Sequence, residues 1–134
     1  MSVIHPLARL MMGTTYALLG YDALRQPGAR VDQAAGTLEA IRRVVPLPAD
    51  DELVVRANGG LQAGAGALLA LGVLPRLSAT VLAGTMVPTT AAGHAFWKVE
   101  DPGARKMQRI QFLKNVAMIG GLLSVAATKR SQSV

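Results

Sequence analysis

The stretch from Leu77 to Trp97 constrains the fold more than any other part of the sequence, because its 21 residues carry no charged side chain. A helix of this length is roughly 30 Å long, which matches the hydrocarbon thickness of a bilayer. Pro88 lies inside the stretch and should either kink the helix or leave the carbonyl group near Gly84 without a donor. The sequence therefore predicts a transmembrane helix here.

Three further apolar stretches have a similar length, at residues 7–24, 53–74 and 106–128. Only Pro75 and Arg76 separate the second stretch from the third, so those two helices should be antiparallel neighbours. The chain has 14 glycines and 4% aromatic residues, a composition typical of helices that pack closely inside lipid. We therefore expect an all-α fold, a four-helix transmembrane bundle that forms a single domain over residues 1–134.

Residues 30–45 differ from the four apolar stretches. Their apolar side chains recur at helical spacing, but the segment is too short and too charged to cross a membrane. It predicts an amphipathic helix in the first loop, which would lie either on the membrane interface or against the protein. Acidic residues at 50–52 follow two prolines and are suited to capping the next helix.

Small residues follow one face of two predicted spans. In the first they are Gly13, Ala17 and Gly20, and in the second Gly60 and Gly64 form a GxxxG pair. Because glycine lets two helix backbones approach closely, we expect these positions to contact neighbouring helices.

The charge pattern favours lipid over nucleic acid as a partner. The net charge is +6, but the basic residues flank the apolar stretches, as they do beside membranes. The chain has no cysteine, and its two histidines, His5 and His94, should lie at opposite membrane faces, so we expect no metal site. Lys129 and Arg130 should end the last helix, and residues 131–134 should form a short polar tail.

Polar residues gather at one end of the predicted bundle. Because successive helices alternate in direction, the end of the first, the start of the second, the end of the third and the start of the fourth share one membrane face. The polar residues found there are the candidate ligand-binding residues Asp22, Arg56, Asn58, Gln62, His94, Trp97, Lys114 and Asn115. Asn58 and Gln62 are four residues apart and share a helix face.

Two interpretations of this polar end remain open. In the first it forms a shallow pocket for a quinone head group, a lipid head group or an anionic solute. In the second, Arg56 and Lys114 reach out to the interface, Arg56 pairs with Asp22 or Glu52, and the amides bridge helices. His94 would then belong, like Trp97, to the aromatic belt at the membrane boundary. No arrangement of catalytic residues can be argued from the sequence.

Several motifs resemble those of the DoxX family, small bacterial membrane proteins with four helices. The resemblance covers nearly the whole chain, and its most specific part pairs a His-x-Phe-Trp motif with a Phe-Leu-Lys-Asn motif. The matching segments are Gly20 to Arg25 with Pro27, Leu47-Pro48, Arg56 to Gly59, Gln62 to Gly66, Leu71-Gly72 before Pro75-Arg76, Val87 to Thr90, Gly93 to Trp97, Phe112 to Asn115 and Gly120 to Leu123.

The resemblance implies a multi-pass protein of the bacterial cytoplasmic membrane. Some family members are linked to membrane-associated oxidoreductase assemblies, and a related branch forms part of a thiosulfate:quinone oxidoreductase. Our first hypothesis is therefore an accessory subunit without catalytic activity of its own, which contacts lipid and other membrane subunits, in an assembly linked to redox chemistry. A quinone-binding subunit of a membrane oxidoreductase is the second, and a carrier or receptor for a lipid or small solute is the third.

Two indications of membrane orientation disagree. The resemblance implies that both termini are cytoplasmic. Basic residues are more numerous in the first and third loops than at the other end, which by the positive-inside rule would place the termini outside.

Overall fold

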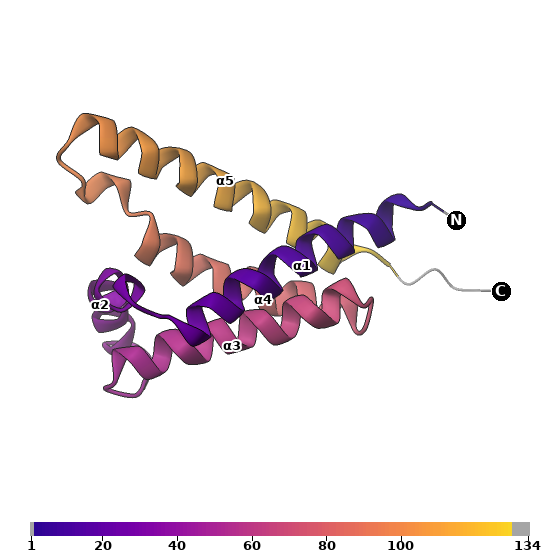
Figure 1. Ribbon diagram of the computed structural model, residues 1–134, viewed down its shortest axis with the longest axis horizontal. Coiled ribbons are helices and arrows are strands. Elements are labelled where there is room, and N and C mark those ends of the chain that lie inside the picture. The colour runs from indigo at the N-terminus through magenta and orange to yellow at the C-terminus, as the bar shows by residue number, and fades with distance from the viewer. Residues whose placement is uncertain (1, 130–134) are drawn as a thin grey trace.

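A computed structural model describes residues 2–129, so the polar tail expected at residues 131–134 lies outside the described part of the chain. The described residues fold into helices and loops, without strands. The helices are α1 (Ile4–Arg25), α2 (Ala29–Arg42), α3 (Asp51–Ala70), α4 (Pro75–Gly93), a 3-10 turn η1 (Phe96–Lys98) and α5 (Pro102–Ala127) (Figure 1).

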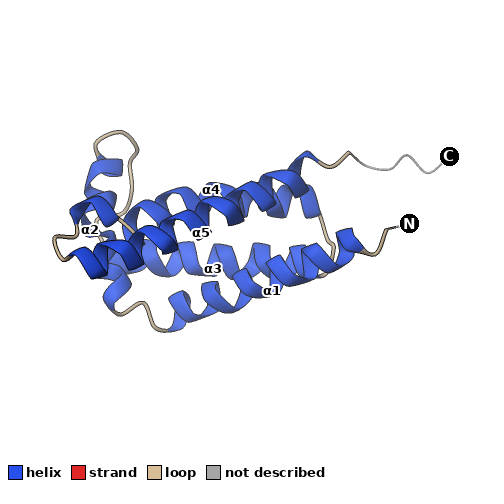
Figure 2. Ribbon diagram, turned by 90° about the horizontal axis from the view of Figure 1, so that it is seen from above, coloured by secondary structure: helices blue, strands red, loops and turns tan. Residues whose placement is uncertain are grey.

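The four long helices run alternately up and down, which places the N-terminus and the end of α5 at one end of the molecule (Figure 1). We call this the terminal end, and the opposite end, which holds α2 and η1, the α2 end. The helix α1 packs along α3, α3 packs on α4, and α4 packs on α5 (Figure 2). The helices α1 and α5 make little contact, because α5 diverges from α1 toward the α2 end (Figure 1).

Glycines allow α1 and α3 to meet backbone to backbone. A Cβ atom placed on Gly20 would lie 2.4 Å from the backbone nitrogen of Ala63, and one on Gly66 would lie 2.5 Å from that of Ala17. No side chain fits at such distances. The small-residue face expected on the first helix is therefore confirmed, with Gly13, Ala17 and Gly20 lying against α3.

The prediction for the second small-residue face was wrong about which glycines are used. The glycines of α3 that contact α1 are Gly59 and Gly66, whereas Gly64 faces open space and Gly60 approaches only the side chain of Leu24. Gly59 and Gly66 are seven residues apart, two helical turns, and therefore share one face. Gly60 and Gly64 lie on an adjacent face, so their GxxxG spacing does not mark this interface.

The core lies where α1, α3, α4 and α5 meet, in the half of the bundle toward the terminal end. Tyr16 from α1, Leu69 from α3, Leu82 from α4 and Leu122 from α5 are its fully buried large side chains. Met12 extends this contact, because its terminal methyl lies 3.4 Å from where a Cβ of Gly121 would be. One aromatic and three aliphatic side chains thus hold all four long helices together.

The helix ends agree with most of the capping signals. The Asp50 carboxylate accepts hydrogen bonds from the backbone N–H groups of Glu52 and Leu53 at the start of α3. The Asp101 carboxylate does the same for Ala104 at the start of α5, 2.8 Å away. The third predicted span ends early, however, because α4 stops at Gly93, and His94 adopts a non-helical backbone conformation. Trp97 consequently lies in η1, outside the helix.

The segment expected to form an amphipathic helix is helical, as α2, and packs against α3 and α4. Of the two positions considered for it, the structure thus shows contact with the protein, with Ala34 and Leu38 buried. The helix ends at Arg42, three residues before its predicted end at Val45. Val45 precedes Pro46, and helical backbone geometry is disfavoured for a residue that precedes proline. Arg42 fixes this end, since its guanidinium bonds the Pro48 carbonyl and pairs with the Asp51 carboxylate at 2.6 Å.

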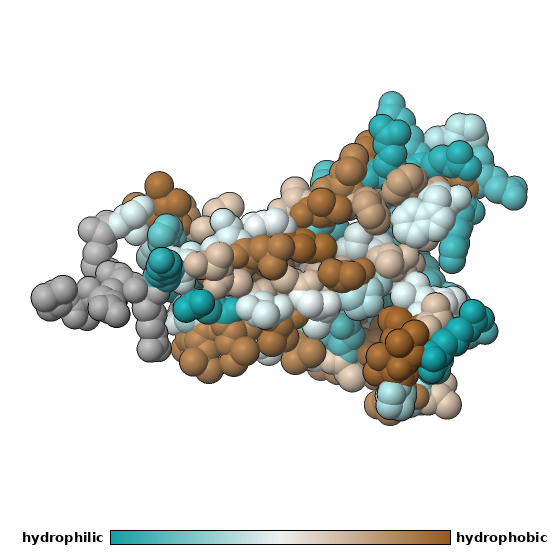
Figure 3. Space-filling model, turned by 180° about the vertical axis from the view of Figure 1, so that it is seen from behind, coloured by the Kyte–Doolittle hydropathy of each residue, from teal (hydrophilic) through white to brown (hydrophobic). Residues whose placement is uncertain are grey.

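The outer surface is apolar around the middle of the bundle and polar at its two ends (Figure 3). Among the described helices, one, Pro102–Ala127, is long and apolar enough by length and composition to cross a membrane. The helix α4 falls short of that measure because it is rich in Ala, Gly, Thr and Pro, whose hydropathy is modest. Large apolar side chains are nevertheless exposed on all four long helices, among them Leu18, Leu61, Val87 and Leu113.

Candidate functional site

A cavity of about 770 Å³ lies at the α2 end and is bounded by side chains of all five α-helices. The sequence placed its candidate polar residues at this end of the bundle. The residues among those candidates that line the cavity are Asn58, Gln62, His94, Lys114 and Asn115.

Threonines of α4 bind the amide side chains in this cavity. The Asn58 amide donates a hydrogen bond to Thr89 Oγ1 at 3.1 Å, and the Gln62 amide donates to Thr89 and to Thr85, both at 3.3 Å. The Asn115 amide donates to Thr90 Oγ1 at 3.2 Å. These bonds tie α3 and α5 to α4, as expected if the amides bridge helices.

Tyr16 carries the one buried hydroxyl that lacks a hydrogen-bond partner among the described residues. Its side chain is 1% exposed and lines the cavity from α1. A buried hydroxyl without a partner costs roughly 1–3 kcal/mol of stability, so its presence calls for an explanation. The hydroxyl oxygen is itself buried, so a polar ligand atom in the cavity would supply the missing bond once the side chains around the hydroxyl shift.

His94, which follows the end of α4, and Lys114 of α5 both line the cavity. His94 Nδ1 lies 2.8 Å from Gln108 Oε1, and because an amide oxygen can only accept, Nδ1 carries the proton. In the neutral ring, Nε2 is then a hydrogen-bond acceptor. Lys114 is exposed, and its ammonium group forms no ion pair with any residue that the structure describes.

Three candidate residues do not line the cavity. Arg56 pairs with Glu52 at 2.8 Å and donates to the Leu24 carbonyl at 2.7 Å, so it joins the end of α1 to the start of α3. Asp22 is exposed on α1. Trp97 packs edge-on against Phe96 and Phe112, with ring centroids 5.3 and 5.9 Å away.

Sequence reasoning missed several residues of the cavity wall. Tyr16 gave no signal, because a tyrosine within an apolar stretch normally belongs to the core. Gln111 could have been found, since Gln111, Lys114, Asn115 and Met118 are spaced so as to share one helix face. The polar residues contributed by α2 are Arg30, Gln33 and Thr37, and they depend on how α2 packs, which its sequence left open.

The remaining wall is apolar and suits a ligand with a polar head and a hydrophobic body. Leu19 lies on the α1 side, Val54 on the α3 side and Met86 on the α4 side, while Leu38 and Ile41 of α2 cover the cavity. Cavities of a few hundred to about 1,000 Å³ with an apolar lining and a few polar groups are typical of small-molecule sites. Among residues 2–129, no group of three or more His, Cys, Asp or Glu side chains could hold a metal ion.

Comparison with known proteins identifies a family for this chain. The DoxX family model matches residues 5–95, about two thirds of the chain, which includes α1 to α4 and most of the cavity wall. No significant match was found among curated proteins or solved structures. An all-helical fold, an apolar outer surface and this match lead to one conclusion: the chain belongs to the DoxX family of membrane-associated proteins.

Proposed function

We propose that the protein crosses the bacterial cytoplasmic membrane four times as a single domain, with α1, α3, α4 and α5 as the spans. These helices have 22, 20, 19 and 26 residues, lengths that suit a bilayer. Their exposed apolar side chains and the polar ends of the bundle support this arrangement (Figure 3). The helix α2 then lies at the water boundary and covers the cavity at the α2 end.

We further propose that this cavity binds an amphipathic ligand of the quinone class. The observation that carries the proposal is the Tyr16 hydroxyl, buried and unpartnered among the described residues, in the wall of a 770 Å³ cavity. A quinone carbonyl would accept its hydrogen bond. A second carbonyl would accept from the Lys114 ammonium, and the hydroquinone form would donate to His94 Nε2.

The composition of the wall favours a neutral head group over an anionic one. Most of its polar groups are neutral amides and hydroxyls, and its cationic groups are Arg30 and Lys114, with His94 titratable. An anion of high charge density would be better held by several converging cations. The apolar side chains beside them suit a ring and the first part of a hydrocarbon tail.

The role best supported for such a protein is that of an accessory subunit that holds the ligand for a larger membrane assembly linked to redox chemistry. The outer faces of the helices support a partner, because Gly84 of α4 and Gly120 of α5 face open space. Small residues at such positions allow another transmembrane helix to approach closely. The chemistry would then be carried out by the partner.

The test is purification of the tagged protein from its own membranes in mild detergent. Retained small molecules are extracted and identified by mass spectrometry, and co-purifying proteins are identified from the same sample. We expect a quinone bound to the wild-type protein and lost from the Tyr16→Phe variant. The control variant is Tyr21→Phe, because the Tyr21 hydroxyl lies outside the cavity, where it accepts from Arg25. Quinone retained equally by all three proteins would refute the assignment, and membrane subunits in a fixed ratio would identify the assembly.

A further inference from the structure

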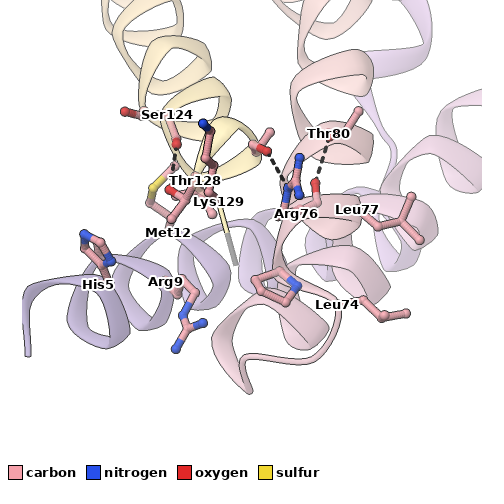
Figure 4. A pocket seen from close by; sticks show the side chains of 15 residues that line it. His5, Arg9, Met12, Leu74, Arg76, Leu77, Thr80, Ser124, Thr128 and Lys129 are labelled. Carbon is pink, nitrogen blue, oxygen red and sulfur yellow. Dashed lines mark hydrogen bonds between the residues drawn. The ribbon is translucent and has the colours of Figure 1, made fainter. Parts of the chain in front are cut away.

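A second cavity, of about 820 Å³, lies at the terminal end of the bundle, away from the proposed ligand site (Figure 4). Its wall comes from the first turns of α1, the turn between α3 and α4, the start of α4 and the last turns of α5. The side chains labelled in Figure 4 include His5 and Arg9 from α1, Arg76 from α4 and Lys129 beyond α5.

Among the described residues, the charged side chains that line this cavity are all positive. Arg9, Arg76 and Lys129 line it, and His5 adds a titratable ring. All eight acidic residues of the chain lie between Asp22 and Asp101, and each belongs to the α2 end of the molecule, within α2, in a loop there or at the near end of α1 or α3. The arginines at the α2 end, by contrast, include three with a carboxylate partner: Arg42, Arg43 and Arg56. Among residues 2–129, the terminal end thus has cations without a counter-charge.

The individual contacts leave most of these cations without a strong partner. Arg9 Nε is buried and has no hydrogen-bond partner among the described residues, and its guanidinium lies beside Gly72. Arg76 Nε donates to the Ala126 carbonyl at 3.0 Å, which leaves its two terminal nitrogens for other acceptors. Helix dipoles favour a cation near the last carbonyls of α3, beside Arg9, and near the Ala126 carbonyl of α5, which Arg76 binds, but neither contact uses all the donors of its guanidinium group.

The rest of the wall is apolar and suits hydrocarbon. Met12, Leu77 and Val125 line the cavity together with Ser124 and Thr128, and the Thr128 hydroxyl donates a hydrogen bond to the Ser124 carbonyl. A phosphate group accepts several charge-assisted hydrogen bonds from arginine, and acyl chains pack on such apolar side chains. We propose that this cavity binds the phosphate of an anionic phospholipid, held by Arg9, Arg76 and Lys129, with an acyl chain against Met12, Leu77 and Val125.

The test measures lipid binding to the delipidated full-length protein in detergent by native mass spectrometry, with phosphatidylglycerol and phosphatidylcholine as probes. We expect phosphatidylglycerol to bind more tightly than phosphatidylcholine, because the latter has no net charge. Each cation near a membrane surface contributes about a five-fold change in binding, so R9Q/R76Q should weaken phosphatidylglycerol binding by roughly 25-fold. The matched control is R109Q, an exposed arginine at the other end of α5, which should change the affinity less than two-fold.

Three outcomes would overturn the proposal. The first is equal affinity for the two lipids, and the second is a loss in R109Q as large as that in R9Q/R76Q, which would indicate general surface attraction. The third is binding of inorganic phosphate as tight as that of phosphatidylglycerol, which would identify a soluble ligand instead. If R9Q/R76Q does not fold, K129Q serves, because Lys129 is exposed and makes no hydrogen bond or ion pair to residues 2–128 in the structure. We expect about a five-fold loss in K129Q, and an unchanged affinity would contradict the assignment.

Discussion

Gly13 of α1 lies against the backbone of Ala70 in α3, so close that a Cβ atom on Gly13 would be 2.3 Å from the Ala70 nitrogen and 2.5 Å from the Gly66 carbonyl oxygen. The atoms it would meet belong to the backbone and cannot move aside as a side chain can. A single methyl group at this position would therefore force the two helices apart.

We expect Gly13→Ala to destabilise the protein by about 1–3 kcal/mol, the usual cost of overpacking a closely packed contact. The matched control is Gly64→Ala, at a position on α3 where a Cβ meets nothing within 4 Å. Alanine favours helix there, so the control should be neutral or slightly stabilising. Reversible unfolding in mixed detergent micelles measures both. Equal stability of the two variants would show that α1 and α3 do not meet at Gly13.

Tyr16→Phe should stabilise the ligand-free protein, because it removes a buried hydroxyl that has no partner among the described residues. The expected gain is of the order of 1 kcal/mol, since the penalty for an unsatisfied buried group is about 1–3 kcal/mol. Thermal unfolding of delipidated samples measures the change. A loss of stability would mean that the hydroxyl has a structural partner, which separates a structural role from the proposed ligand role.

Thr89→Val should weaken the attachment of α3 to α4. The Thr89 hydroxyl accepts from the amides of both Asn58 and Gln62, and Gln62 is 6% exposed. Hydrogen bonds between membrane helices contribute about 0.6 kcal/mol each, so we expect a loss of roughly 1 kcal/mol. Thr80→Val is the control, because its hydroxyl donates to the Arg76 carbonyl of its own helix. The idea fails if both variants unfold alike.

Arg42→Ala should release α2 from the bundle, because the Arg42 guanidinium joins the Pro48 carbonyl and the Asp51 carboxylate at the end of the helix. We expect faster amide hydrogen exchange over residues 29–42 and weaker retention of the ligand that α2 covers. The control is Arg43→Ala, because the Arg43 side chain is 75% exposed and its one ion pair among the described residues is with Glu39 of α2, at 3.5 Å. Unchanged exchange in Arg42→Ala would show that apolar contacts alone hold α2.

The sequence allowed the helices and their ends to be predicted where the signals are local. Asp50 caps the helix that it precedes, because a carboxylate one position before a helix can reach free N–H groups whatever the rest of the fold does. The gathering of polar residues at one end followed from helix direction alone, and five of the eight candidates do share a cavity. Those predictions needed no knowledge of helix rotation.

Several features that depend on how α3 and α1 are rotated were not predictable. The face of α3 that meets α1 contains Gly59 and Gly66, while the equally suitable Gly64 points away, and only the packed structure distinguishes them. Tyr16 is similar, since its position in the cavity wall depends on the angle between α1 and α3. From the sequence, either Asp22 or Glu52 could pair with Arg56. In the structure Arg56 pairs with Glu52, because both residues lie on α3, one turn apart.

The divergence of α5 from α1 also determines the side from which a ligand can enter the cavity at the α2 end. Thr15 and Leu19 on one side and Met118 on the other line it, yet their helices make little contact with each other. If the four helices span the membrane, this side opens between two spans, toward the acyl chains. Occupancy would then follow the mole fraction of the ligand among the lipids, and a water-soluble analogue without a tail would be a poor competitor at any concentration in the buffer.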